Sequence, residues 1–209
     1  MGGGAEAEER DEKDMKSPAV FLDRDGTINE QMGYINHVSR FVLLPRVARA
    51  IKMLNDNGYK SVVVSNQSGV ARGYFPLELV HEVNHVMEDL LWKEGAKLDG
   101  TYFCPHHPQG LIPEYAIACD CRKPGNGLIT LAKRDFDIDM NKSFVVGDRC
   151  QDLEMAERSG LQGVLVLTGY GKGERDYLLP KKHVKPTYVA EDLLDGVRWI
   201  IDSGKKGTR

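Results

Sequence analysis

Asp23 and Asp25 stand two residues apart at the end of an apolar run, in the stretch AVFLDRDGT (residues 19–27). The run is typical of a buried strand in a parallel sheet, and Gly26 is typical of the turn that ends such a strand. Ligands of open α/β sheets bind beyond the carboxyl ends of the strands, so this architecture places both carboxylates where it keeps its chemistry. We interpret Asp23 as a nucleophile and Asp25 as its acid/base partner.

Other polar residues follow the same logic further along the chain. Ser65 ends the apolar run KSVVVS, and Asp148 comes directly after SFVV and a glycine. Lys123 lies between the third and fourth predicted strands, and Asp152 follows Asp148 by about one helical turn. Each residue alone is an ordinary turn former or surface group. Together and in this order they indicate a site that holds a phosphate or a metal ion.

Strands that alternate with helices must position these side chains. After the strand at 19–22 we predict strands at 60–65, 98–103, 143–146, 163–167 and 187–190. We predict helices at 45–57, 76–94, 127–136 and 191–202, and a short helix after Asp148 that ends at Ser159. This alternation predicts a Rossmann-like, doubly wound parallel sheet covered by helices on both faces. We expect one domain over residues 18–209, without a large cap domain. Residues 1–17 are Gly-rich and then heavily charged, so we expect a disordered tail.

Composition limits the partners. The 209 residues carry a net charge of −3 and no basic stripe, which argues against nucleic acid. No apolar run approaches the roughly 20 residues that span a bilayer, and no signal peptide is evident. We expect a cytoplasmic monomer that acts on a small molecule.

Three of the four cysteines cluster near a pair of histidines. Cys104, Cys119 and Cys121, with His106 or His107, form knuckles of the C-x-H and C-x-C kind. Three thiolates and one imidazole complete a tetrahedral zinc shell and leave no position for water, so such a zinc ion would be structural. The alternative is three unrelated free thiols. Cys150 we interpret as a bystander.

The order of these motifs resembles that of the haloacid dehalogenase-like (HAD-like) phosphohydrolases. That family carries D-x-D-G-T, a Ser or Thr after an apolar strand, a Lys before a helix, and G-D with another acid shortly after. The resemblance implies hydrolysis through an aspartyl-phosphate. It assigns the catalytic roles to Asp23, Asp25, Ser65 and Lys123. It implies Mg²⁺ held by the side chains of Asp23 and Asp148 and the main-chain carbonyl of Asp25, with Asp152 orienting a metal-bound water or Lys123.

The cysteine segment sharpens this resemblance. CPHHPQG followed by CDCRKP is similar to the heptose bisphosphate phosphatase branch, and the similarity extends from about Pro18 to the end of the chain. In that branch the zinc ligands are the equivalents of Cys104, His106, Cys119 and Cys121. The branch removes the C7 phosphate of D-glycero-D-manno-heptose 1,7-bisphosphate, on the route to nucleotide-activated heptose. The histidinol-phosphate phosphatase branch shares the knuckles with a shorter spacer and is the first alternative.

The resemblance also implies which residues bind the substrate. They are Gln31, Met32, Gly33, Tyr34, Asn66, Gln67, Ser68, Arg122 and Arg149. A catalytically idle phosphosugar-binding protein is the second alternative, against which the presence of Asp23, Asp25, Lys123 and Asp148 argues. Two other patterns we discount: HEVNH (81–85) as a protease site, and GYGKG (169–173), which we interpret as a flexible loop.

Overall fold

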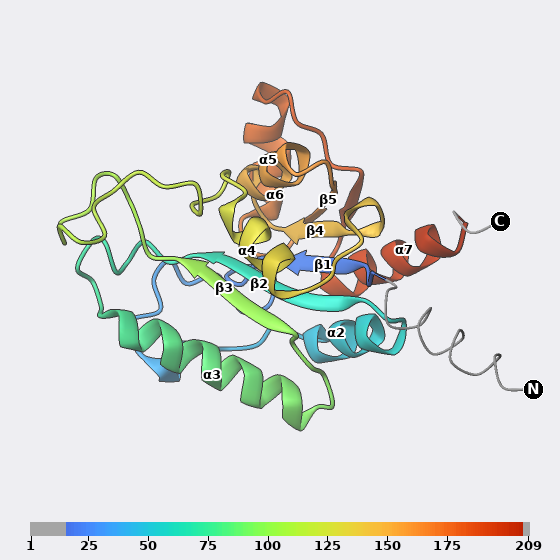
Figure 1. The fold of residues 1–209 in the computed structure, drawn as a ribbon, viewed down its shortest axis with the longest axis horizontal. Coiled ribbons are helices and arrows are strands. Elements are labelled where there is room, and N and C mark those ends of the chain that lie inside the picture. Colours follow the sequence, from blue (N-terminus) through green and yellow to red (C-terminus); the bar gives the residue numbers. More distant parts are fainter. Residues whose placement is uncertain (1–15, 207–209) are drawn as a thin grey trace, which may run out of the picture.

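The structure, a computed structural model, describes residues 16–206. In this part of the chain six parallel strands form one sheet in the order β3-β2-β1-β4-β5-β6 (Figure 1). They are β1 (Ala19–Leu22), β2 (Lys60–Asn66), β3 (Gly100–Cys104), β4 (Phe144–Gly147), β5 (Gln162–Val166) and β6 (Tyr188–Ala190). The central strands β1 and β4 are buried along their whole length, as their uninterrupted apolar sequences predict.

Helices cover both faces of the sheet. They are α2 (Val47–Asp56), α3 (Leu77–Lys93), α4 (Gly127–Asp135), α5 (Cys150–Arg158), α6 (Gly171–Gly173) and α7 (Leu193–Lys206). Short 3-10 helices lie at η1 (Val38–Arg40), η2 (Met140–Lys142) and η4 (Leu179–Lys181), and a π-helical turn at η3 (Glu174–Leu178). One core cluster joins α2, α3 and α7 to the sheet, and a second lies under α4 and α5. The predicted doubly wound architecture is confirmed.

The strand order places a topological switch at the centre of the sheet. From β1 the chain proceeds outward to β2 and β3, then returns to β4 on the other side of β1 and proceeds outward again. Loops leaving β1 and β4 therefore diverge and leave a crevice between them, which is where open α/β sheets bind ligands. Asp23 and Asp148 directly follow these two strands.

The prediction of a flexible loop at 169–173 is wrong. Residues 171–181 form a continuous helical segment made of α6, η3 and η4. Gly171 is buried, and a Cβ atom at this position would lie 1.8 Å from the carbonyl oxygen of Val166. The glycine permits close packing of a helix against β5, and does not mark a mobile chain.

The start of the domain differs slightly from expectation. Most of the predicted tail, residues 1–15, lies outside the described residues. Ser17, which we placed at the end of that tail, is paired: its N–H donates to Asp137 (3.1 Å), and its carbonyl accepts from the N–H of Asp139 (2.9 Å). No helix in the described range 16–206 is long and apolar enough to cross a membrane.

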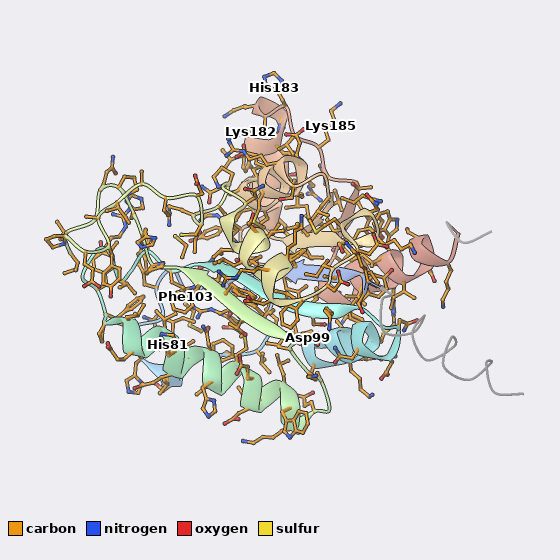
Figure 2. The ribbon with its side chains drawn as sticks, in the orientation of Figure 1. His81, Asp99, Phe103, Lys182, His183 and Lys185 are labelled. Atoms are coloured by element: carbon orange, nitrogen blue, oxygen red, sulfur yellow. The ribbon has the colours of Figure 1, made fainter. Side chains whose placement is uncertain are left out.

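The two histidines of the HEVNH pattern have different surroundings. His81 packs edge-on against Phe103 of β3, with ring centroids 5.2 Å apart (Figure 2). His85 is exposed and faces Asp89 at 3.7 Å. Neither histidine belongs to a group of potential metal ligands among the described residues.

Candidate active site

A pocket of about 270 Å³ opens at the carboxyl ends of the central strands. It is lined by Asp23, Asp25, Gln31, Gly33, Tyr34, Asn66, Ser68, Arg122, Lys123, Arg149, Gln151, Asp152 and Tyr170. Most of the residues that the sequence assigned to catalysis and substrate binding therefore meet in one place. Met32, Ser65, Gln67 and Asp148 are not among the lining residues.

Lys123 is the buried cation of the site. Its Nζ donates to Oδ1 of Asp23 at 2.5 Å, to Oδ1 of Asp152 at 2.6 Å and to the carbonyl of Val64 at 3.0 Å. Only 4% of the side chain is exposed. Burial alone would lower the pKa of Lys123, but the attraction of Asp152 and Asp23 outweighs it and raises this pKa above its ordinary value. Lys123 is therefore a permanent positive charge beside the predicted nucleophile.

Asp148 lies beyond β4 and is completely buried. Its Oδ2 accepts from the N–H of Tyr170 at 2.8 Å, whereas its Oδ1 has no hydrogen-bond partner among the described residues. Gly26 (φ +96°) and Gly169 (φ +52°) make room for the carboxylate, since a Cβ atom on either would lie 2.1 Å from Oδ2. Burying a hydrogen-bond acceptor without a donor costs free energy, so this oxygen is well suited to act as a ligand of a cation.

The donor set fits a divalent cation. Carboxylate oxygens of Asp23, Asp148 and Asp152 lie within 4.8 Å of one another. Burial, with repulsion from Asp23 and Asp152, raises the pKa of Asp148 to about 8. Burial also raises the pKa of Asp23 to about 6, although Lys123 opposes it. Three carboxylates facing one ammonium leave excess negative charge, which a hard cation such as Mg²⁺ would balance.

Asp152 is the least available of these three carboxylates. Its Oδ1 accepts from Lys123, and its Oδ2 accepts from the N–H of Arg149 at 3.1 Å, at the start of α5. Both oxygens are thus engaged by protein donors. This pattern favours the expectation that Asp152 orients Lys123 and leaves metal ligation to the other two aspartates.

Asp25 faces the pocket and is held by several donors. Asn29 donates to its Oδ1 at 3.0 Å, and Gln67 donates to its Oδ2 at 2.8 Å. Arg24 forms an ion pair with the same carboxylate at 3.0 Å. The main-chain carbonyl of Asp25 accepts from Gln31 at 3.2 Å. The side chain is therefore fixed in orientation before any substrate binds.

The residues after β2 act partly behind the pocket wall. Ser65 is 2% exposed, and its Oγ accepts from Nε2 of Gln67 at 2.6 Å. The amide of Asn66 exchanges two hydrogen bonds with the backbone of Lys123, at 3.0 and 3.2 Å. Gln67 and Asn66, which the resemblance assigned to substrate binding, are thus committed to holding Asp25 and Lys123.

One aromatic and one acidic residue of the site, Tyr170 and Glu174, were not predicted from the sequence. The guanidinium of Arg149 lies over the ring of Tyr170, 4.6 Å from its centroid. Glu174 is buried, lies 3.6 Å from Nε of Arg149, and accepts from the N–H of Cys150. Tyr170 lies in the segment 169–173 that the sequence predicts as a flexible loop, and Glu174 directly follows it, so no strand or helix signal pointed to either residue.

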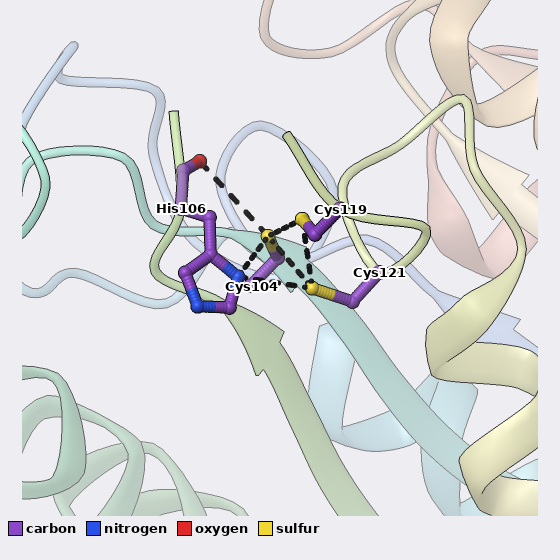
Figure 3. Close-up of side chains that lie close together, drawn as sticks. All are labelled: Cys104, His106, Cys119 and Cys121. Atoms are coloured by element: carbon purple, nitrogen blue, oxygen red, sulfur yellow. Dashed lines mark hydrogen bonds between the residues drawn. The ribbon is translucent and has the colours of Figure 1, made fainter. Parts of the chain in front are cut away.

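The side chains of Cys104, His106, Cys119 and Cys121 converge at one point (Figure 3), next in the sequence to the pocket residue Arg122. Cys104, His106, Cys119 and Cys121 offer ligand atoms within 4.8 Å of one another, and the three sulfur atoms lie 3.1–3.5 Å apart. A zinc tetrahedron with Zn–S bonds of about 2.3 Å has edges of about 3.8 Å, close to this spacing. Hydrogen bonding with Cys104 lowers the pKa of Cys121 to about 5, so one thiolate is already favoured. The four residues therefore fit zinc.

Residues next to this cluster belong to the pocket wall. Arg122 directly follows the last cysteine and donates from Nη1 to the carbonyl of His106 at 3.3 Å. His107, the second histidine, is not a member of the cluster and instead contacts Arg72 at 3.0 Å. The cysteine cluster thus holds Arg122 at the pocket.

Fold and site together define the class of protein. The family model described as HAD-hydrolase-like matches residues 120–196. A solved structure of D,D-heptose 1,7-bisphosphate phosphatase from B. bronchiseptica, complexed with magnesium and phosphate, superposes with a TM-score of 0.78 at 30% identity, covering 90% of this chain and 99% of that one. This is a HAD-like hydrolase fold.

Curated relatives narrow the class. D-glycero-D-manno-heptose-1,7-bisphosphate 7-phosphatase of Thermosynechococcus vestitus is 42% identical over 191 residues, covering 89% of this chain and 96% of the relative. D-glycero-beta-D-manno-heptose-1,7-bisphosphate 7-phosphatase of Escherichia coli is 42% identical over 178 residues, covering 85% and 91%. The chain belongs to this family of HAD-like sugar bisphosphate phosphatases.

Proposed function

We propose that this protein removes the C7 phosphate of D-glycero-D-manno-heptose 1,7-bisphosphate through an aspartyl-phosphate on Asp23, with Mg²⁺ as cofactor. The relatives support the substrate, because their names state this reaction and the chain spans nearly their whole length. The observation that carries the mechanism is the buried Lys123 shared by Asp23 and Asp152 at the pocket.

The first chemical step is an attack by Asp23 on phosphorus. A phosphate monoester is a dianion and repels a carboxylate, so the site must supply positive charge. The side chains of Asp23 and Asp148 and the carbonyl of Asp25 would hold Mg²⁺, which would supply positive charge that offsets this repulsion. Lys123 donates to the phosphoryl oxygens as charge develops on them. We propose that Ser65, although it lies behind the pocket lining, also donates to the phosphoryl group, because its oxygen accepts from Gln67 and its O–H is left to donate.

Asp25 completes both half-reactions. As the bond from phosphorus to the C7 oxygen breaks, Asp25 gives that oxygen a proton, and the sugar leaves as an alcohol. Asp25 then takes a proton from the water that attacks the aspartyl-phosphate, which releases inorganic phosphate and restores Asp23. Its place at the pocket, 18% exposed beside the buried Asp23, gives it access to both oxygens.

The pocket also carries groups suited to the sugar and its second phosphate. Arg122 and Arg149 present guanidinium groups, whose planar donors match a phosphate anion. Tyr170 and Glu174 fix the second of these arginines, and the cysteine cluster fixes the first. Gln31, Gly33, Tyr34, Asn66, Ser68 and Gln151 also line the pocket.

A substrate panel tests the proposal. Phosphate release is measured from the heptose bisphosphate, fructose 1,6-bisphosphate and histidinol phosphate, with Mg²⁺ and after EDTA treatment. We expect the heptose ester to be preferred by about 100-fold in kcat/KM, a sugar 1-phosphate as the product by phosphorus NMR, and activity that returns when Mg²⁺ alone is added back. Preference for histidinol phosphate, or full activity in EDTA, would contradict it.

We infer that Cys104, His106, Cys119 and Cys121 bind a structural zinc ion. Their side chains supply a full tetrahedral shell, so no open position remains for catalysis. The segment that connects them has no helix or strand of its own between β3 and α4. Zinc would stabilise this segment, and through it the position of Arg122.

A further inference from the structure

Arg24, between the two site aspartates, is a buried cation that the chemistry above does not use. Its side chain is 2% exposed. The guanidinium donates hydrogen bonds to both carboxylate oxygens of Asp25. Nη2 lies 3.0 Å and Nε 3.2 Å from Oδ2, and Nη2 lies 3.3 Å from Oδ1. Burying a guanidinium is costly and persists only where its donors are well satisfied. The remaining edge of Arg24 must therefore also find a partner.

That partner comes from α3. Oδ1 of Asn84 accepts from Nη1 of Arg24 at 2.9 Å. Asn84 is 7% exposed and is the polar member of a helix face whose other buried residues are Val80, Val83, Met87 and Leu91. An amide on an apolar face is unfavourable unless it satisfies a buried group. Here the buried group is the guanidinium, 60 residues away in the sequence.

We propose that Asn84 and Arg24 are positioning residues for the acid/base Asp25. Asn84 fixes one edge of the guanidinium, and the opposite edge fixes both oxygens of the carboxylate. Asn29 and Gln67 donate to the same two oxygens, so the carboxylate cannot turn. A planar, forked donor is suited to this task because it sets the orientation as well as the distance. The inference rests on the proposed role of Asp25.

The consequence differs between substrates. A general acid must lie within hydrogen-bond reach of the leaving oxygen, and a small displacement is costly. An alkoxide leaving from a sugar needs that proton, whereas 4-nitrophenolate is stable enough to leave without it. Loss of positioning should therefore reduce hydrolysis of the sugar ester much more than hydrolysis of 4-nitrophenyl phosphate.

The test compares Asn84→Leu, which removes the acceptor, with Asn84→Asp, which keeps it. The readout is kcat/KM, because it reports only the steps up to departure of the leaving group. We expect Asn84→Leu to lower kcat/KM for the heptose bisphosphate by about 10- to 100-fold, and for 4-nitrophenyl phosphate by less than about threefold. Asn84→Asp should restore the heptose value to within about threefold of wild type.

Val83→Ala is the matched control, because it removes a buried side chain from the same helix without touching an acceptor. It should destabilise the protein and leave the ratio of the two kcat/KM values unchanged. If Asn84→Leu does not fold, Asn84→Ser is measured in its place. Equal losses on both substrates, no loss on either, or failure of Asn84→Asp to restore the ratio would overturn the proposal.

Failure of the proposed function gives a different result. Wild-type protein that releases no phosphate from the heptose ester contradicts the substrate assignment alone. The same ratio is then measured with fructose 1,6-bisphosphate or histidinol phosphate, whichever the wild type hydrolyses. A selective loss with that alkyl ester would support the positioning role, and an unselective one would contradict it.

Discussion

Asp23→Asn should abolish phosphate release while the protein stays folded. The amide has the shape of the carboxylate but is a poor nucleophile, so we expect kcat to fall by about four orders of magnitude or more. Folding should survive, because Lys123 keeps its bonds to Asp152 and Val64. The substitution also removes one of three buried carboxylates that repel one another. Phosphate release in single-turnover assays, with thermal unfolding in parallel, measures both effects.

Asp176→Asn is the matched control for that variant. Asp176 is a surface carboxylate that forms an ion pair with its neighbour Arg175 at 2.7 Å and does not line the pocket. The same chemical change there should leave kcat within about twofold of wild type. Turnover near the wild-type rate in Asp23→Asn would contradict the covalent mechanism, whereas an unfolded variant would contradict the expected tolerance of the site.

Replacing Cys119 and Cys121 with Ser should abolish the proposed zinc binding and destabilise the protein. Binding of a structural zinc ion contributes about 10–16 kcal/mol in small zinc modules, and part of that energy is folding energy. Even a fraction of it is large beside the total stability of a domain, about 5–15 kcal/mol. We expect loss of stoichiometric zinc by elemental analysis, a lower free energy of unfolding, and faster proteolysis between β3 and α4.

Cys150→Ser is the control for the zinc variant. Its thiol is buried next to Glu174, away from the cluster, and burial raises its pKa to about 12. A Ser hydroxyl can take the place of that thiol beside the same carboxylate. Zinc content should therefore stay at one ion per chain. Full stability and an intact cleavage pattern in the metal-free double variant would show that the segment does not depend on zinc.

Sequence patterns predict the secondary structure of this protein well, for an identifiable reason. The central strands β1 and β4 are fully buried, so their apolar runs are uninterrupted, and the helices α2 and α3 carry the expected apolar faces. Errors occur where glycine serves packing. At Gly171 a side chain would collide with the backbone of β5, but the sequence around it has the composition of a loop. Composition does not separate close packing from mobility.

The residues of the site also fall into those that the sequence predicts and those that only the structure shows. Motifs predict Asp23, Lys123 and Asp148. Asp23 and Asp148 each follow a predicted strand and Lys123 precedes a predicted helix, and these element ends meet at one edge of the sheet. Tyr170 lies in the 169–173 segment that was wrongly predicted as a loop, and Glu174 lies outside every predicted element, so the sequence assigned neither residue to the site. The commitment of Gln67 to Asp25 also needs coordinates, because a lone amide in a loop has no characteristic spacing.

Asn84 did leave a signal in the sequence. It occupies an apolar position of the predicted helix at 76–94, between Val83 and Met87, where a polar residue is unexpected. Such a residue indicates a buried partner but does not identify it. Only the fold shows that the partner is Arg24, one residue from each site aspartate.

The most direct test of the mechanism is to trap the phosphorylated enzyme. Wild-type protein is mixed with substrate and Mg²⁺, quenched in acid within one turnover, reduced with borohydride and digested. The mechanism predicts homoserine in place of Asp23 in the peptide that carries β1, and an unmodified peptide without substrate. Phosphate release with no modification at Asp23, or with modification at another carboxylate, would contradict it.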